Sequence, residues 1–433
     1  MSKRAQFRLE ILSSLLLCAR LATGQLTLDQ QFQSALAAYK AGRLVQAATQ
    51  LEQLLSRAPN LFEAHELLGV VYASESQADK AIEQLQAAVR LNSGDFEANH
   101  NLGELYVQSE KVAEATPFLE RAQRIDPSSY DNGYDLALAY SLTGQRGQAR
   151  QLVQTLLQQK NSAELHNLLA QIEEKDGNYL AAENEFSVAA HMEPSESNLF
   201  DWGSELLVHR TYEPAIQIFE RAAQRYPNSP RLMMALGMAL SAQGKYEESI
   251  QPLLKAADLN PVDTRCYRFL SHAYDVSPSP SPEVVQRFRR YSELQPDNAM
   301  AQFYYALSLL KGKTPEASSP EFHQVESLLQ KSIAVDGNFA EAHFRLGNLY
   351  ADQHDDAKAF PEYARAVALN PNLPDAHYRL GQYYVHAGKK DLAQREFADY
   401  QRLRAQYLAQ LDKEGNEVQQ FVSAAKAAPA TKP

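Results

Sequence analysis

A short phrase recurs along the chain at a nearly fixed interval. FEAHELLGVVY at 62–72 is followed 34 residues later by FEANHNLGELY at 96–106, and a third near-copy, EAHFRLGNLY, occupies 341–350. A duplicated chemical site and a duplicated structural unit both predict such copies, and they imply different functions. A period that continues along the whole chain would favour the structural unit.

Two independent series of residues carry the period. In the first, a small residue follows a large apolar one: Leu68-Gly69, Leu102-Gly103, Leu136-Ala137, Leu169-Ala170, Trp202-Gly203, Leu236-Gly237, Leu270-Ser271, Tyr305-Ala306, Leu346-Gly347 and Leu380-Gly381. In the second, a residue that stops a helix recurs: Pro59, Ser93, Pro127, Asn161, Pro194, Pro227, Pro261, Pro296, Gly337 and Pro371. Successive members of both series are 33 to 35 residues apart, with one step of 41. Two series in step indicate an array of repeated structural units.

Each unit has the apolar pattern of two helices. In 62–94, Leu68, Val71 and Tyr72 form the stripe of a first helix, and Ile82 and Leu85 belong to that of a second. The small residue of the first helix allows the second helix to approach closely, and so do the second-helix alanines at 47, 81, 115, 149, 182, 215, 359 and 393. Because one helical hairpin cannot bury both of its faces, neighbouring hairpins must stack.

This phrase, the later alanine and the closing proline, at this period, resemble the tetratricopeptide repeat (TPR) family. The resemblance implies an all-α fold, a right-handed α-solenoid of about eleven stacked antiparallel helix pairs, the TPR superhelix. The units begin near residues 28, 62, 96, 130, 163, 196, 230, 264, 299, 340 and 374, so the array spans 28–405. Three departures are local. SPSPSP at 277–282 shortens or bends one second helix, KGKTPEASSP at 311–320 contains an inserted loop, and Ala35 replaces the glycine of the first unit.

The two ends of the chain differ from the array. Residues 1–24 are similar to a signal peptide, because a basic start precedes the apolar run ILSSLLLC and Ala22-Thr23-Gly24 has the small-x-small cleavage pattern. An ordinary amphipathic first helix, or a lipoprotein signal acylated at Cys18, are the alternatives. The helical pattern after the array predicts a capping helix at 406–424 and a disordered tail at 425–433. With the signal the protein is exported, periplasmic or secreted, and without it cytoplasmic.

Charge and composition exclude several classes of function. The formal net charge of −11 argues against broad nucleic-acid binding, which requires a basic surface. The apolar run at 11–18 is too short to cross a bilayer, so no transmembrane helix is expected in the mature chain. Cysteines 18 and 266 form no metal-binding motif, and Cys266 is interpreted as a packing residue.

The candidate catalytic and metal-binding residues are better explained by structure. His65, His166, His343 and His377 share the fourth position of their repeats, on helices about 10 Å apart. Zinc requires ligands about 2 Å from one centre, so no metal site and no cofactor is predicted. Adjacent carboxylates such as Glu173-Glu174 diverge on a helix, and the array leaves no room for a catalytic domain. The protein is predicted not to be an enzyme.

The resemblance implies a binding groove lined by the first helices. Carried onto this sequence, its positions in the early repeats are Glu63, Glu66, Glu97, His100, Glu104, Asp131 and Tyr134. In the late repeats they are Arg265, Arg268, His272, Phe303, Tyr304, Phe344, Arg345, Asn348, Tyr378, Arg379 and Gln382. The groove is thus expected to be acidic early and to combine arginines with aromatic side chains late. The Lys and Asn pattern with which some TPR domains hold chaperone tails is incomplete, so that partner is not inferred.

The sequence therefore predicts a non-catalytic scaffold that binds a protein or an extended peptide, in an exported, bacterial-type context. Two alternatives stay open. The chain could be the recruiting or regulatory arm of an enzyme complex, for example a glycosyltransferase-like one, whose catalytic subunit is separate. It could also form homo-oligomers through its end helices. The sequence does not identify the partner.

Overall fold

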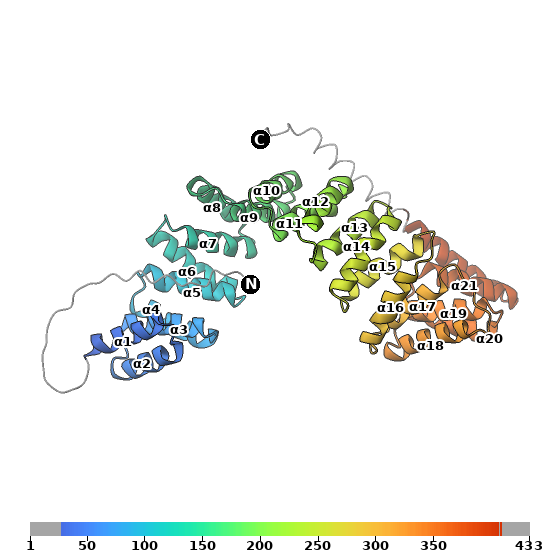
Figure 1. The fold of residues 1–433 in the computed structure, drawn as a ribbon, viewed down its shortest axis with the longest axis horizontal. Coiled ribbons are helices and arrows are strands. Elements are labelled where there is room, and N and C mark those ends of the chain that lie inside the picture. The colour runs from blue at the N-terminus through green and yellow to red at the C-terminus, as the bar shows by residue number, and fades with distance from the viewer. Residues whose placement is uncertain (1–26, 407, 409–433) are drawn as a thin grey trace. The chain divides into compact units, whose positions relative to one another are not determined.

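The structure is a computed structural model that describes residues 27–406 and 408. Every regular element among these residues is an α-helix, and none is a strand (Figure 1). None of the described helices is both long enough and apolar enough to cross a lipid bilayer. The predicted signal peptide at 1–24, the capping helix at 406–424 beyond its first residue and the tail at 425–433 lie outside the described residues, Leu408 apart.

The chain divides into two compact units, and the first ends at Met192. Unit 1 contains five helix pairs in its described part, each pair made of a first and a second helix. The first helices are α1 (Leu28–Lys40), α3 (Phe62–Ser74), α5 (Phe96–Gln108), α7 (Tyr130–Leu142) and α9 (Ala163–Lys175). The second helices are α2 (Leu44–Arg57), α4 (Ala78–Leu91), α6 (Val112–Ile125), α8 (Arg146–Gln159) and α10 (Tyr179–Met192).

Unit 2 begins at Glu193 and contains six pairs within the described residues. Its first helices are α11 (Glu196–Val208), α13 (Pro230–Ala242), α15 (Thr264–Val276), α17 (Ala299–Leu310), α19 (Ala340–Ala351) and α21 (Pro374–His386). Its second helices are α12 (Tyr212–Arg225), α14 (Tyr246–Leu259), α16 (Pro282–Leu294), α18 (Pro320–Val335) and α20 (Asp356–Leu369), and the last described helix covers 390–406. The eleven first helices begin at the residues where the sequence analysis places the starts of the repeat units.

Short turns make the helices of a pair antiparallel. Three residues join α3 to α4, and the middle one, Ser76, has a φ of 60°. The same turn position is occupied by Gly42 and Gly244 in other repeats, because a residue without a Cβ atom adopts positive φ at little cost. Each helix packs on the next one within its unit, so each unit is an all-α solenoid, and the predicted fold class is confirmed.

The glycines of the period mark the closest approach within a pair. A Cβ atom built on Gly69 would lie 2.6 Å from Cγ of Leu85, and one built on Gly237 would lie 2.5 Å from Cγ of Leu253. Non-bonded carbon atoms do not approach to such distances, so any larger residue would force Leu85 or Leu253 to move. The second-helix alanine Ala81 is fully buried. The interpretation of the small residues as sites of close helix packing is therefore confirmed.

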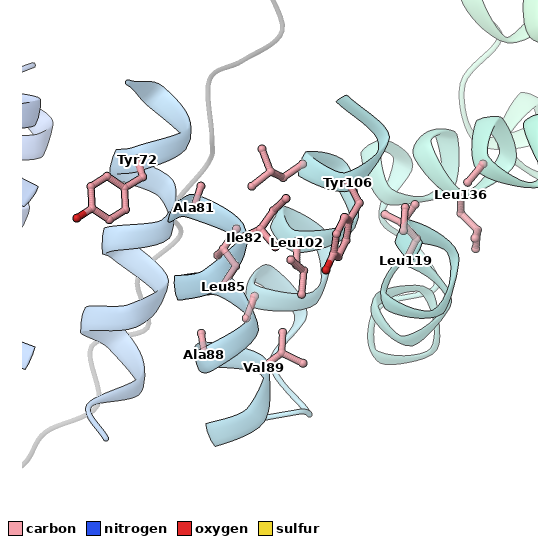
Figure 2. Close-up of a cluster of buried hydrophobic side chains, with 14 of the residues drawn as sticks. Tyr72, Ala81, Ile82, Leu85, Ala88, Val89, Leu102, Tyr106, Leu119 and Leu136 are labelled. Atoms are coloured by element: carbon pink, nitrogen blue, oxygen red, sulfur yellow. The ribbon is translucent and has the colours of Figure 1, made fainter. Parts of the chain in front are cut away.

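The core of unit 1 is one continuous cluster of buried side chains along the stack. Figure 2 shows Ile82 and Leu85 of α4 beside Leu102 of α5, so the cluster passes from one repeat into the next. Tyr106 of α5 is also buried in this cluster and extends it toward α6. A lone pair would leave these faces in water, and burial of apolar area therefore couples each repeat to its neighbours.

Two of the three expected departures are segments between helices, and both segments differ from those of the other repeats. Five residues, 277–281, separate α15 from α16, and α16 starts at Pro282 with Ser281 as its N-cap. As a result α15 packs on α14 and α17 more extensively than on α16. Residues 311–319 form the loop before α18, and the side chain of Gln353 holds this loop by donating to Pro315 O and accepting from Ala317 N.

Candidate partner-binding surface

Three arginines on first helices of unit 2 form the strongest candidate site. Arg268 lies on α15, Arg345 on α19 and Arg379 on α21, and we call these three residues the arginine group. Arg268 is exposed and the other two are half-buried. None of them has an ion-pair partner among the described residues, whereas other arginines of unit 2, such as Arg287 with Asp258, are paired. The positive charges of the group are therefore available to an external anion.

Aromatic rings position two of these guanidinium groups. The guanidinium carbon of Arg268 lies 5.1 Å from the ring centroid of Phe269, and that of Arg345 lies 5.9 Å from the ring centroid of Phe344. A cation over an aromatic face is held by the ring quadrupole without loss of its charge. Ring and guanidinium together present an apolar surface beside a planar set of donors, which suits a carboxylate flanked by apolar groups.

Other predicted residues of the late repeats are accessible to different degrees. His272 is exposed, and its ring centroid lies 5.5 Å from that of Tyr246. Tyr378 is exposed as well, and its ring packs against Phe397 and Tyr400. The remaining three, Phe344, Asn348 and Gln382, are half-buried. These side chains add aromatic and amide groups to the helices that carry the arginine group.

Asn348 and Arg265 already have partners within the protein. The hydroxyl of Tyr363 donates to Oδ1 of Asn348 over 2.9 Å, which occupies one of the two lone pairs of this oxygen. Arg265 donates twice to Asp263, from Nε over 3.0 Å and from Nη2 over 2.7 Å. Its charge is therefore neutralised locally, and Arg265 is a weaker anchor than the arginine group.

Two predicted residues do not belong to the surface. Phe303 and Tyr304 of α17 are buried in the core of unit 2. The ring centroid of Phe303 lies 4.8 Å from that of Phe339, and the centroid of Tyr304 lies 6.0 Å from that of Phe288. Assigning them to the groove was wrong, because residues from the adjacent second helix and from the turn before α19 cover this part of α17.

The predicted acidic residues all lie in unit 1. Glu63 and Asp131 are exposed, and Glu97 and Tyr134 are half-buried. The pKa of Glu66 is raised to about 8. Burial is the main cause, and the negative charges of neighbouring carboxylates such as Asp95 add to it. Because Glu66 keeps its proton near neutral pH, the negative charge of this face is smaller than the sequence indicates.

Burial also changes the titration of two further residues on α5. It raises the pKa of Glu104, whose carboxylate accepts a hydrogen bond from Gln108, and it lowers the pKa of His100. The ring of His100 stacks on Phe96 at 5.6 Å between centroids, and its Nδ1 lies 3.3 Å from Oδ1 of Asn132. His100 is therefore a neutral, packed side chain near neutral pH, and it contributes no positive charge.

The four histidines at the fourth position of their repeats each join two helices of one pair. Their Nδ1 atoms lie within hydrogen-bonding distance of a side chain 19 residues later: His65 with Gln84, His166 with Glu185, His343 with Glu362 and His377 with Glu396. Nε2 of His65 and of His377 in addition contacts the carbonyl of Pro59 and of Pro371. The structural interpretation of these histidines is confirmed. Among the described residues no cluster has the composition of a metal site.

Sequence reasoning missed Arg210, which follows α11. Its φ is 58°, a conformation that Gly244 adopts at the same turn position in the next repeat. Arg210 lines a pocket together with Arg268 and His272. Ser76 and Glu110 have the same conformation at this turn, so the sequence of the turn gave no signal, and Arg210 is recognised only by its place in the pocket.

Comparison with known families agrees with this architecture. Family models described as Tetratricopeptide repeat match residues 32–96, 75–130 and 200–264 with one model, 106–172 with a second and 340–373 with a third. Together they cover more than half of the chain, and this protein belongs to the tetratricopeptide repeat family. A search of curated proteins found no match.

Several solved structures are similar to this chain. A tetratricopeptide repeat protein from Parabacteroides merdae is 16% identical over 57% of this chain and 98% of its own, with a TM-score of 0.45. PilW, a type IV pilus biogenesis factor, is 19% identical over 48% of this chain and 98% of its own, with a TM-score of 0.42. YrrB, a TPR protein with an unusual peptide-binding site, is 17% identical over 43% and 97%, with a TM-score of 0.36.

Proposed function

We propose that this protein is a scaffold that binds an acidic protein segment on the first helices of unit 2. The observation that carries the proposal is the arginine group, in which Arg268, Arg345 and Arg379 have no ion-pair partner within the described residues. Arg345 and Arg379 are half-buried, and a charge that is partly removed from water normally gains a partner, because desolvation without one costs free energy. A carboxylate-rich partner would supply it, with bidentate geometry at each guanidinium.

The chemistry around the arginine group suits binding and offers no reaction. The nearby side chains are aromatic rings, amides and an exposed histidine, and the combination of arginine with tyrosine is typical of interface hot spots. The partner is thus an acidic segment of a protein, held by a few guanidinium contacts with aromatic contact area around them. Electrostatic attraction would accelerate its association and make the affinity decrease with salt.

Affinity capture followed by mass spectrometry tests this function. The full chain serves as bait in its native host, alongside a variant with Arg268→Glu, Arg345→Glu and Arg379→Glu. A matched control carries Arg221→Glu, Arg225→Glu and Arg395→Glu, which change the charge equally on second helices. The proposal predicts at least one acidic protein that the wild type and the control capture and the first variant does not. A capture list that is the same for all three baits contradicts it.

We also propose that the protein is exported, on the basis of residues 1–24 alone. Their basic start, the apolar run at 11–18 and the small residues at 22–24 are the features that signal peptidases and translocases recognise. Sequencing the N-terminus of the protein purified from its native host tests the proposal. A mature chain that begins at Gln25 supports export, and a chain that begins at Met1 contradicts cleavage.

A further inference from the structure

A pocket of about 650 Å³ opens in unit 2 beside α11, α13 and α15. Its apolar wall includes Val208 of α11, Met238 of α13 and Phe269 of α15. The side chain of Val208 is 67% exposed, which is unusual for a large aliphatic residue that lines a concavity. The volume is within the range of pockets that bury most of a ligand or a large side chain, roughly 300–1,000 Å³.

Basic side chains line the pocket, and acidic ones do not. Arg210, Arg268 and His272 line it together with the apolar wall, and no aspartate or glutamate does. Two other pockets are lined by both signs of charge: Asp258 and Glu283 stand with Lys255 and Arg287 in one, and Glu75 stands with Arg43 in the other. An anionic group is therefore favoured at this pocket, where no carboxylate opposes it.

Ser241 provides a second observation that points to a ligand. Its hydroxyl oxygen is buried, lacks a hydrogen-bond partner among the described residues, and belongs to a side chain that lines the pocket. A hydroxyl on a helix usually donates to a carbonyl of the preceding turn. A buried polar atom without a partner costs free energy, and a peptide group that enters the pocket would satisfy it.

We propose that this pocket receives one bulky apolar side chain of an acidic peptide, while carboxylates beside that residue bind Arg268 and Arg210. The inference rests on the proposed function and names the sequence that the partner must carry. The apolar wall disfavours a peptide segment that contains only charged residues. The arginines disfavour a peptide in which lysine or arginine stands next to the apolar residue. Val208 and Phe269 are then covered by the partner.

The turn that carries Arg210 allows a variant in which its side chain alone is removed. Arg210 has positive φ where Gly244 stands in the next repeat, so an Arg210→Gly variant preserves the backbone conformation and removes only the side chain. Ala242 is exposed at the end of α13 and lines the pocket, so Ala242→Trp fills the pocket from its edge without a change in the core. Val276→Trp is the matched control, because Val276 ends α15, is similarly exposed and does not line the pocket.

The test is selection from a phage-displayed library of random dodecapeptides against the full chain. The baits are the wild type, Ala242→Trp, Arg210→Gly, Val276→Trp and the double variant Arg345→Glu with Arg379→Glu. Circular dichroism and thermal unfolding establish that each bait is folded. The proposal predicts that the wild type and Val276→Trp enrich peptides with a bulky apolar residue flanked by Asp or Glu. Ala242→Trp should lose the apolar preference, and Arg210→Gly should weaken the acidic one.

A synthetic peptide of the enriched class gives the quantitative readout. Replacing its apolar residue by alanine should weaken binding to the wild type roughly tenfold or more, and should change binding to Ala242→Trp by less than about twofold. If Ala242→Trp enriches the same peptides as the wild type while the double variant does not, the pocket assignment is wrong and the proposed function stands. If no bait enriches an acidic class, both are wrong.

Discussion

Nδ1 of His377 on α21 lies 2.7 Å from Oε2 of Glu396 in the helix that follows, so a polar bond joins the two helices of the last pair. His343 and Glu362 repeat this contact at 2.6 Å, one repeat earlier. In the second repeat the partner of His65 is the neutral Gln84, at 2.8 Å. The contact therefore recurs as a hydrogen bond whose acceptor is either a carboxylate or an amide.

The first prediction concerns this bond. Glu396→Ala should lower the free energy of unfolding by about 1–2 kcal/mol, because His377 is left buried with one nitrogen unpaired. Glu396→Gln should have less than half of that effect, since Gln84 serves the same role for His65. Urea unfolding of both variants measures the difference. Equal losses in the two variants would show that the bond contributes nothing specific.

Close packing at the repeated glycine gives a second prediction. Gly237→Ala should destabilise the protein by roughly 1–3 kcal/mol, because the new methyl group would overlap Leu253 and force α13 and α14 apart. Gly147→Ala in α8 is the control. A Cβ atom there meets nothing within 4 Å, so this substitution should stabilise the helix by up to about 1 kcal/mol. Thermal unfolding of the two variants should give shifts of opposite sign.

Glu66 gives a third prediction, on pH. Burial raises its pKa in the folded protein from 4.5 to about 8, so between these values the unfolded chain loses a proton that the folded chain keeps. The stability contributed by protonated Glu66 is therefore complete below pH 4.5 and decreases as the pH rises to 8. Glu66→Gln cannot ionise, and should be more stable than the wild type by roughly 2–4 kcal/mol near pH 9 and about equal near pH 4.

Denaturant unfolding across this pH range checks the prediction on Glu66. The control is Glu114→Gln, which removes an exposed carboxylate of α6 in the same unit. Its stability should follow that of the wild type at every pH. A Glu66→Gln variant with the same pH dependence as Glu114→Gln would rule out Glu66 as the titrating group.

Cys266 gives a fourth prediction, on reactivity. Burial raises the pKa of its thiol to about 12, and Sγ donates to the carbonyl of Leu253 over 3.1 Å. Alkylation by iodoacetamide at pH 8 should therefore be roughly 100-fold slower or more in the native protein than in urea. Mass spectrometry of the peptide containing Cys266 measures the rate separately from Cys18. Native labelling at the rate seen in urea would show that α15 opens freely.

Much of the fold could be predicted from the sequence, because the same packing residues recur in one repeat after another. Gly69 and Gly237 both mark the close approach of the two helices of a pair, and each first helix starts at the residue that the period predicts. The polar bonds were not predicted. The spacing of 19 residues between His377 and Glu396 is visible in the sequence, but polar side chains at helical spacing give no sign of whether they face each other or the solvent.

The candidate site was predicted less well, because exposure at a repeat position depends on the neighbouring repeats. Arg268 and Phe303 both stand at the fifth position of their first helices. Arg268 is exposed, whereas Phe303 packs against Phe339 from the turn before α19. Position within the repeat determines which way a side chain leaves the helix. Only the adjacent helices determine whether another residue covers it.

A binding titration with the purified acidic partner, measured by fluorescence anisotropy, tests whether the first helices of unit 2 bind this partner. The wild type is compared with the variant reversed at Arg268, Arg345 and Arg379, and with the control reversed at Arg221, Arg225 and Arg395. The account predicts that the first reversal weakens binding by roughly 100-fold or more and the control by less than about threefold. Equal affinities of the two variants would contradict the assignment of binding to the first helices of unit 2.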